Sequence, residues 1–124
     1  MEETLKQLKE VHSSSLIIIL FGDNFRIYDE DARVLEYNSN LIGEKNVLVC
    51  KFKYLENVKS ILKKRKINYV ILDRDRDYRI YDYYYTDFNK YNKYLKKSKK
   101  FNSVRRFFVC LNNLLFNIPL NRYK

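Results

Sequence analysis

The run Asp73-Arg74-Asp75-Arg76-Asp77 places five charged side chains in a row in this chain of 124 residues. If the run is extended, alternate side chains point to opposite faces, so Asp73, Asp75 and Asp77 share one face. Three such carboxylates could hold a divalent cation, as in a metal-dependent nuclease. Because no histidine or further acid completes a known metal-binding spacing, we favour a charged hairpin tip or sheet edge. We therefore predict no metal, no other cofactor and no catalysis.

The two cysteines and the single histidine offer no reactive site either. Cys50 and Cys110 both follow apolar residues, and neither has a cysteine or histidine at a metal-ligand spacing. A free cysteine behaves as a small buried hydrophobe, so we expect two reduced core residues in an intracellular protein. We interpret His12, which has no catalytic partner nearby in the sequence, as a surface residue at a helix end.

Positive charge is concentrated in the second half of the chain, which has a net charge of +10 overall. Residues 1–50 hold 5 basic and 9 acidic side chains, whereas residues 51–106 hold 18 basic and 6 acidic ones. A segregated basic segment indicates a polyanion or an acidic protein surface as partner. An AT-rich coding sequence, which favours Lys, Asn, Tyr, Ile and Phe, is the alternative explanation for the overall charge.

Two groups within the basic segment are candidates for contacts with nucleic acid. Lysines and arginines neutralise phosphates, and exposed aromatic rings stack on unpaired bases. A basic cluster at the end of a helix also suits the negative end of the helix dipole, a structural role that is compatible with phosphate contact. The candidates for phosphate contact are Lys63, Lys64, Arg65 and Lys66, and those for stacking are Tyr83, Tyr84 and Tyr85.

Both strands and helices must position these residues. The apolar run Leu16–Phe21, bounded by turn residues, is typical of a buried strand. Further strands are expected after Gly22 and at residues 46–52, 67–73 and 78–85, and helices at residues 3–11, 29–36 and 54–65. Alternation along the last strand places Ile80 and Asp82 on the same face. The chain is thus predicted to have an α+β fold, a mixed central sheet of about five strands flanked by helices.

The C-terminal part of the chain has a helical pattern. From residue 87 to residue 118, apolar residues recur every three or four positions, interrupted only at Ser98. The pattern predicts one long helix, or two helices joined near residues 98–103, ending at Pro119. We therefore divide the chain into an α+β domain, residues 1–86, and a basic helical extension, residues 87–124. The extension is expected to pack on the domain or to form a homodimer or partner contact.

A known family resembles this sequence around the first turn. After the apolar strand, Gly22 and Asp23 are followed by an aromatic and acidic pattern that ends at Ala32. This pattern resembles the N-terminal mismatch-recognition domain (domain I) of the MutS mismatch-repair proteins, and the whole chain resembles its small stand-alone bacterial relatives. The resemblance covers roughly residues 4–80 as a fold pattern, and the stand-alone relatives share a Lys- and Tyr-rich tail. The other matching residues are Phe25, Ile27, Tyr28, Asp31 and Ala32.

Two residues depart from the MutS pattern at the positions that matter for mismatch recognition. Asn24 and Arg26 stand where that family has a Phe that wedges beside the mispaired base and a Glu that hydrogen-bonds to it. Asn cannot stack as a wedge, and Arg reverses the charge. The chain also lacks a Gly-x-x-x-x-Gly-Lys-Ser/Thr loop and has no room for an ATPase domain. We expect the fold without the mismatch mechanism, with Asn24 at a base edge and Arg26 at a phosphate.

These observations predict a non-catalytic, cytoplasmic module that binds DNA or another nucleic acid without sequence specificity. The alternative is a protein-interaction domain that keeps the fold but not DNA binding, with the C-terminal helix as its docking or dimer surface. The apolar run Leu16–Phe21 is too short to span a bilayer, so no membrane contact is expected. Steep salt dependence of DNA binding favours the first function, and concentration-dependent helix burial without DNA binding favours the second.

Overall fold

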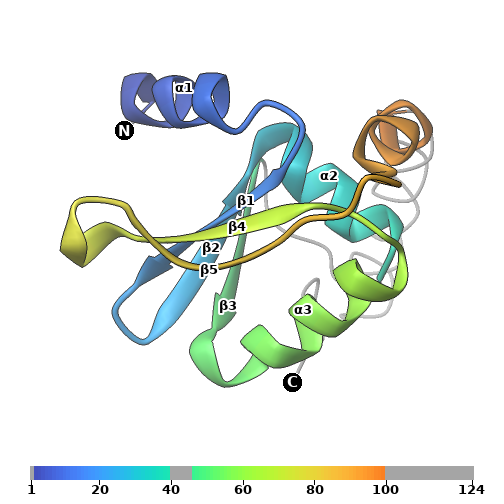
Figure 1. Ribbon diagram of the computed structural model, residues 1–124. Coiled ribbons are helices and arrows are strands. Elements are labelled where there is room, and N and C mark those ends of the chain that lie inside the picture. The colour runs from blue at the N-terminus through green and yellow to red at the C-terminus, as the bar shows by residue number, and fades with distance from the viewer. Residues whose placement is uncertain (1, 40–45, 100–124) are drawn as a thin grey trace, which may run out of the picture.

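The computed structural model describes residues 2–39 and 46–99, which form an α+β fold (Figure 1). Five strands make one mixed sheet in the order β3-β2-β1-β4-β5. Only β1 and β4 pair in parallel, and the other neighbours are antiparallel. The predicted mixed sheet of about five strands is therefore confirmed. The strands are β1 (Leu16–Phe21), β2 (Asn24–Tyr28), β3 (Val47–Lys51), β4 (Tyr69–Asp73) and β5 (Arg79–Tyr84).

Four helices accompany the sheet in the described residues. They are α1 (Glu2–Val11), α2 (Asp29–Tyr37), α3 (Leu55–Lys64) and a helix over residues 91–99, which we call the C-terminal helix. The predicted extension beyond residue 99 lies outside the described residues, as does Cys110. None of the helices within the described ranges combines the length and the apolar character needed to cross a bilayer.

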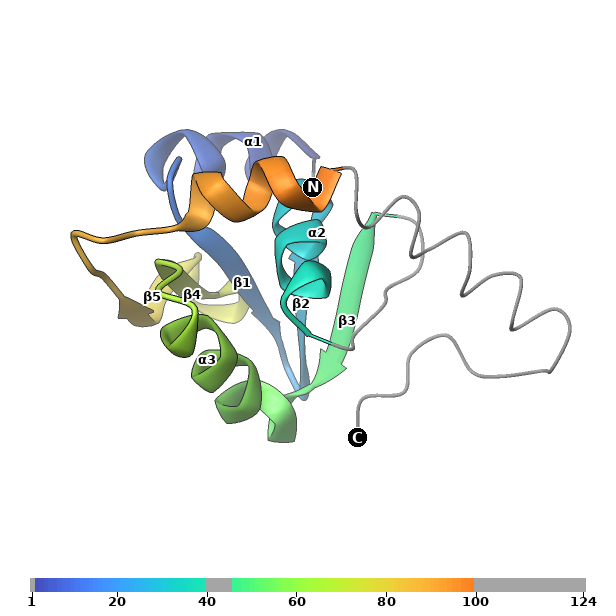
Figure 2. The same ribbon diagram turned by 90° about the vertical axis from the view of Figure 1, so that its right-hand side faces the viewer.

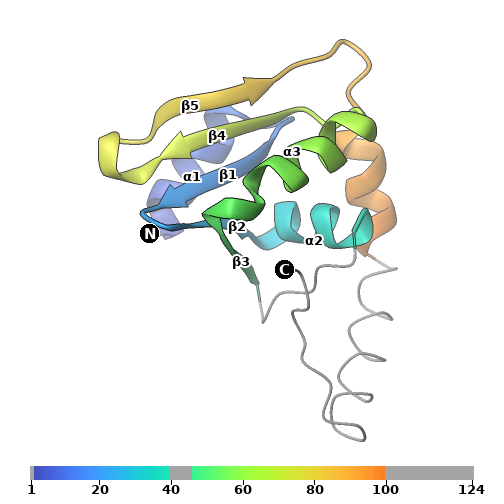
Figure 3. The ribbon, with the colours of Figure 1, turned by 90° about the horizontal axis from the view of Figure 1, so that it is seen from below.

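The central strand β1 is apolar on both faces because it separates two cores. Leu16 and Ile18 lie in the main core with residues of α2, α3 and the C-terminal helix. Ile17 and Ile19 lie in a smaller core on the opposite face, against α1. Figure 3 shows α3 in front of the sheet and α1 behind it, with the C-terminal helix beside the ends of the strands.

A two-residue turn connects β1 to β2. Phe21 pairs with Asn24, so Gly22 and Asp23 form the whole connection. Gly22 has a φ of +63°, a conformation that glycine adopts without strain. The turn directs alternate residues of β2 to opposite faces. Phe25 enters the main core, and Asn24 lies on the other face of the sheet, the α1 side.

The run 73–77 is not an extended strand. Its three carboxylates therefore do not line up on one face in the way that an extended run would place them. Asp73 ends β4, and Arg74–Arg76 form a 3-10 turn. The side chain of Asp73 accepts a hydrogen bond of 3.0 Å from the backbone N–H of Asp75. The interpretation as a charged hairpin tip is confirmed, because β4 and β5 pair on either side of this turn. Within residues 2–39 and 46–99, no three His, Cys, Asp or Glu side chains are grouped so that they could hold a metal ion.

A β-bulge between β4 and β5 makes the predicted alternation along residues 78–85 wrong. Ile71 pairs with Asp82, whereas the next residue, Leu72, pairs with Ile80. Ile80 therefore shares a face with Leu72, on the α1 side, while Asp82 shares the main-core side with Ile71. The bulge is what allows Asp82 to reach α3, where its carboxylate lies 2.5 Å from the ammonium of Lys59.

Candidate nucleic-acid interface

Two basic segments that are distant in the sequence meet at one end of the molecule. The backbone N–H of Lys90, just before the C-terminal helix, donates a 2.8 Å hydrogen bond to the carbonyl of Lys66, just after α3. Figure 2 brings this end toward the viewer, with α3 in green and the C-terminal helix in orange. The junction combines the predicted Lys63–Lys66 cluster with lysines of the C-terminal helix in one surface.

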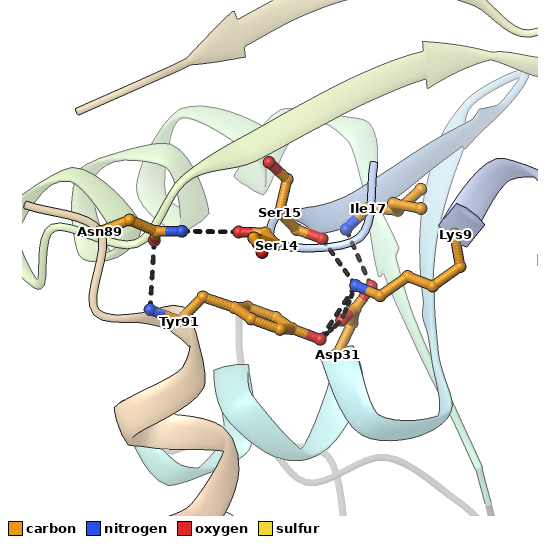
Figure 4. Close-up of polar contacts among 7 residues, drawn as sticks. All are labelled: Lys9, Ser14, Ser15, Ile17, Asp31, Asn89 and Tyr91. Carbon is orange, nitrogen blue, oxygen red and sulfur yellow. Dashed lines mark hydrogen bonds and ion pairs between the residues drawn. The ribbon is translucent and has the colours of Figure 1, made fainter. Parts of the chain in front are cut away.

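Two asparagines hold the junction in place. The backbone N–H of Asn68 donates to Oδ1 of Asn89 at 2.9 Å, and Oδ1 of Asn68 accepts the N–H of Thr86 at 2.8 Å. Nδ2 of Asn89 donates to the carbonyl of Ser14 at 2.6 Å, and its Oδ1 accepts the N–H of Tyr91 at 3.1 Å (Figure 4). The last bond caps the start of the C-terminal helix. The chain that leads into this helix is thus fastened to the sheet.

The positively charged side chains of this junction, which belong to residues 63–66, Lys90 and Lys93, are available to a partner. None of them makes an ion pair within 4 Å in the part of the chain that the structure describes. All are exposed except Lys90, which is half-buried. Lys96, Lys97 and Lys99 continue the positive charge along the C-terminal helix. We define the basic end as Lys63, Lys64, Arg65, Lys66, Lys90 and Lys93.

Exposed aromatic rings lie next to the basic end. Tyr83 and Tyr85 are exposed, as the sequence analysis required of stacking residues. Tyr84 is not, because its half-buried ring stacks on that of Tyr69 with 5.7 Å between their centres. Phe88, which the sequence analysis did not select, is exposed and lies 5.7 Å below the ammonium of Lys66. Tyr85 and Phe88 are therefore the exposed rings of the segment that joins the basic end, whereas Tyr83, which pairs with Val70, lies on the α1 side of the sheet.

Asn24 and Arg26 lie at the opposite end of the sheet. The guanidinium of Arg26 lies 4.2 Å from the centre of the Phe21 ring, and that of Arg74 lies 4.7 Å from the same ring. Phe21 is the last residue of β1, whereas the first residue of β1 donates its N–H to the carbonyl of Asn68 at the basic end. The basic end and the pair Asn24 and Arg26 are therefore separated by the length of β1, about 16 Å. The structure does not bring all the predicted site residues together.

A buried polar cluster, missed by the sequence analysis, attaches the C-terminal helix to the rest of the fold. Asp31 is only 5% exposed. Its Oδ1 accepts hydrogen bonds from the Lys9 ammonium, at 2.8 Å, and from the Tyr91 hydroxyl, and its Oδ2 accepts the N–H of Ile17 at 3.0 Å. The Lys9 ammonium also donates to the carbonyl of Ser15 at 2.7 Å (Figure 4). The cluster joins α1, α2, β1 and the C-terminal helix.

The electrostatics of this cluster favour a structural role, in which it attaches the C-terminal helix, over a chemically reactive one. Burial raises the pKa of Asp31, while the adjacent Lys9 ammonium acts in the opposite direction. Burial and the Asp31 carboxylate both raise the pKa of Tyr91, so its hydroxyl stays protonated and donates to the carboxylate. Both carboxylate oxygens have partners, as a buried charge requires. A hollow of about 420 Å³ adjoins the cluster, lined in part by Leu5 and Tyr28.

The sequence matches no protein-family model and no curated protein. The resemblance to domain I of MutS therefore stays a prediction, based on Gly22, Asp23 and the residues in register with them. The fold and the site together define an α+β protein that presents exposed cations and exposed aromatic rings at one end of its sheet.

Proposed function

We propose that the protein is a non-catalytic module that binds nucleic acid without sequence specificity through the basic end. The observation that carries this proposal is the hydrogen bond from Lys90 to Lys66, which makes one surface from two basic segments. The exposed ammonium and guanidinium groups of this surface have no ion-pair partner among the described residues. They are therefore free to neutralise phosphates.

The physical driving force would be the release of counterions from the nucleic acid. Each phosphate that a lysine or arginine neutralises releases condensed cations, so affinity falls steeply as salt is added. Such contacts carry no sequence information by themselves. The resemblance to domain I of MutS supports a role in DNA binding, and the missing wedge at Asn24 and Arg26 agrees with binding that ignores mismatches.

A protein-docking function is the second candidate, and the edge strand β5 favours it. Ile80 and Tyr81 are both more than half exposed on this strand. An exposed sheet edge can pair with an extended segment of another protein. The β-bulge at this edge acts against such pairing, because it interrupts the regular ladder. We therefore rank protein docking second.

Charge reversal tests the proposed function directly. Fluorescence anisotropy measures binding of the unmodified protein at about 50 mM salt. The ligands are labelled single-stranded and duplex DNA of about 20 nucleotides per strand. Combined Lys63→Glu, Lys64→Glu and Lys66→Glu substitutions should abolish binding. A matched control carries Lys6→Glu, Lys51→Glu and Lys53→Glu, which change the net charge equally at exposed lysines elsewhere.

The control is expected to bind with an affinity within about threefold of the unmodified protein, since it leaves the basic end intact. Circular dichroism confirms that both variants are folded. Equal losses in the two triple variants would mean that only total charge matters, which overturns the assignment of the site. Absence of binding by the unmodified protein would remove the nucleic-acid function and leave docking through β5 to be tested by pull-down.

A further inference from the structure

Two large rings next to the basic end are exposed to solvent to an unusual degree. The exposed fractions are 68% for Tyr85 and 73% for Phe88. By contrast, Tyr69 and Tyr91, which are neighbours of this segment in the fold, are almost completely buried. Aromatic side chains bury more apolar area than most others, so leaving two of them exposed on one short segment loses stabilisation of the fold. Their exposure indicates a surface that is covered by a partner.

The segment that carries these rings is held in place. The N–H of Thr86 donates to buried Asn68, and the N–H of Phe88 donates to the Thr86 hydroxyl at 3.2 Å. The hydroxyl of Tyr85 donates to the carboxylate of Asp87 at 3.0 Å. The Lys90 hydrogen bond to Lys66 closes the segment at its other end. The backbone that carries the rings is therefore ordered before a ligand binds, so less conformational freedom is lost on binding, which favours affinity.

The chemistry around the rings matches that of a single nucleic-acid strand. The Lys66 ammonium lies over Phe88, so a cation that can reach a phosphate adjoins a ring that can stack on a base. In a duplex, each base is already covered on both faces by its neighbours, and only the phosphates and base edges are accessible. In a single strand, bases can stack on aromatic side chains, and this is sequence-tolerant because every base has a π-face.

We propose that the basic end prefers single-stranded nucleic acid, with unpaired bases stacking on Tyr85 and Phe88 while its cations follow the phosphates. This inference rests on the proposed function, because it concerns the same surface. It adds the class of ligand: a strand with unpaired bases, bound without a requirement for a particular sequence.

Three ligands of equal length separate the contributions of bases and phosphates. They are a poly-dT strand, a duplex, and an abasic strand that keeps the phosphates but has no bases. Anisotropy at a fixed low salt concentration measures the binding of each ligand to the unmodified protein and to the combined Tyr85→Leu and Phe88→Leu variant. Phe52→Leu is the matched control, because Phe52 is an exposed ring at the other end of α3.

We expect the unmodified protein to bind poly-dT at least about tenfold more tightly than the abasic strand. The double leucine variant should lose that difference, bind the duplex as before, and keep its circular dichroism spectrum. Phe52→Leu should behave as the unmodified protein. Equal binding of all three ligands, unchanged in the leucine variant, overturns the single-strand inference but leaves the proposed function intact. No binding of any ligand overturns both, and the exposed rings would then be a protein-docking surface.

Discussion

The backbone N–H of Lys90 donates a 2.8 Å hydrogen bond to the carbonyl of Lys66. This one bond connects the end of α3 to the start of the C-terminal helix, and it determines that the lysines of both elements lie in one surface. The bond forms only if the C-terminal helix is attached to the sheet. The buried cluster around Asp31 and the two asparagines, Asn68 and Asn89, provide that attachment.

Asp31→Ala should destabilise the fold by about 3 kcal/mol, because it leaves the Lys9 ammonium and the Tyr91 hydroxyl without their carboxylate in a buried site. Glu30→Ala is the matched control, since it removes an exposed carboxylate from the same helix turn and should change stability by less than about 0.5 kcal/mol. Urea unfolding followed by circular dichroism measures both. Equal effects of the two substitutions would show that the cluster around Asp31 does not stabilise the fold.

Asp82→Asn should lower stability at neutral pH but not in acid. The hydrogen bond from Lys59 lowers the pKa of Asp82 from its ordinary value of 3.8. The stabilisation is therefore present above that value and is lost as the pH falls through the lower pKa of the folded state. Because the Asp82 side chain is 39% exposed, we expect a loss of only about 1 kcal/mol at neutral pH.

The unfolding free energies of Asp82→Asn and of the unmodified protein should converge as the pH falls below the lowered pKa of Asp82 in the folded state, because the carboxylate of the unmodified protein is then protonated. Asp75→Asn at the exposed hairpin tip is the control and should change stability by less than about 0.5 kcal/mol at neutral pH. A difference that persists unchanged in acid would mean that Asp82 acts through its shape and not through its charge.

Cys50 should be inert toward thiol reagents in the folded protein. Burial raises the pKa of its thiol to about 11, so at pH 8 only about one molecule in a thousand carries the reactive thiolate. In a Cys110→Ser background, Ellman's reagent should react with Cys50 only as fast as the protein unfolds, and addition of urea should release the full signal. Rapid reaction of the native protein would show that Cys50 is not enclosed by the core.

Duplexes with and without a mispair should bind with affinities that agree within about twofold. Asn24 has no ring to wedge beside a base, and the ring of Phe21 is already in contact with Arg26 and Arg74. Parallel titrations of the two duplexes measure this. A preference for the mispair that disappears in Arg26→Ala would contradict the prediction and would assign mismatch recognition to the far end of the sheet.

Local patterns in the sequence were sufficient to predict most of the fold. The apolar run Leu16–Phe21 became β1 with the predicted bounds, because a buried central strand is apolar on both faces and its ends are marked by turn residues. The helix predicted at residues 54–65 became α3, Leu55–Lys64, because its apolar positions recur at the helical period. Both predictions depend only on neighbours in the chain.

The errors and omissions arise from contacts between distant residues. A bulge against β4 turned Asp82 away from the face predicted for it, and packing on Tyr69 buried Tyr84 but not Tyr85. The partners of Asp31 come from α1 and from the C-terminal helix, and no local pattern marks a carboxylate that will meet a lysine and a tyrosine so far away. The basic end itself could be predicted only in part, because the approach of Lys90 to Lys66 is tertiary.

The salt dependence of binding tests the central claim most directly. The logarithm of the association constant for single-stranded DNA is plotted against the logarithm of the salt concentration. Each lost phosphate contact reduces the slope by about 0.7, so combined Lys63→Gln, Lys64→Gln and Lys66→Gln substitutions should reduce it by about 2. The control with Lys6→Gln, Lys51→Gln and Lys53→Gln should leave the slope unchanged. The same slope in both triple variants would contradict the claim that the basic end holds the nucleic acid.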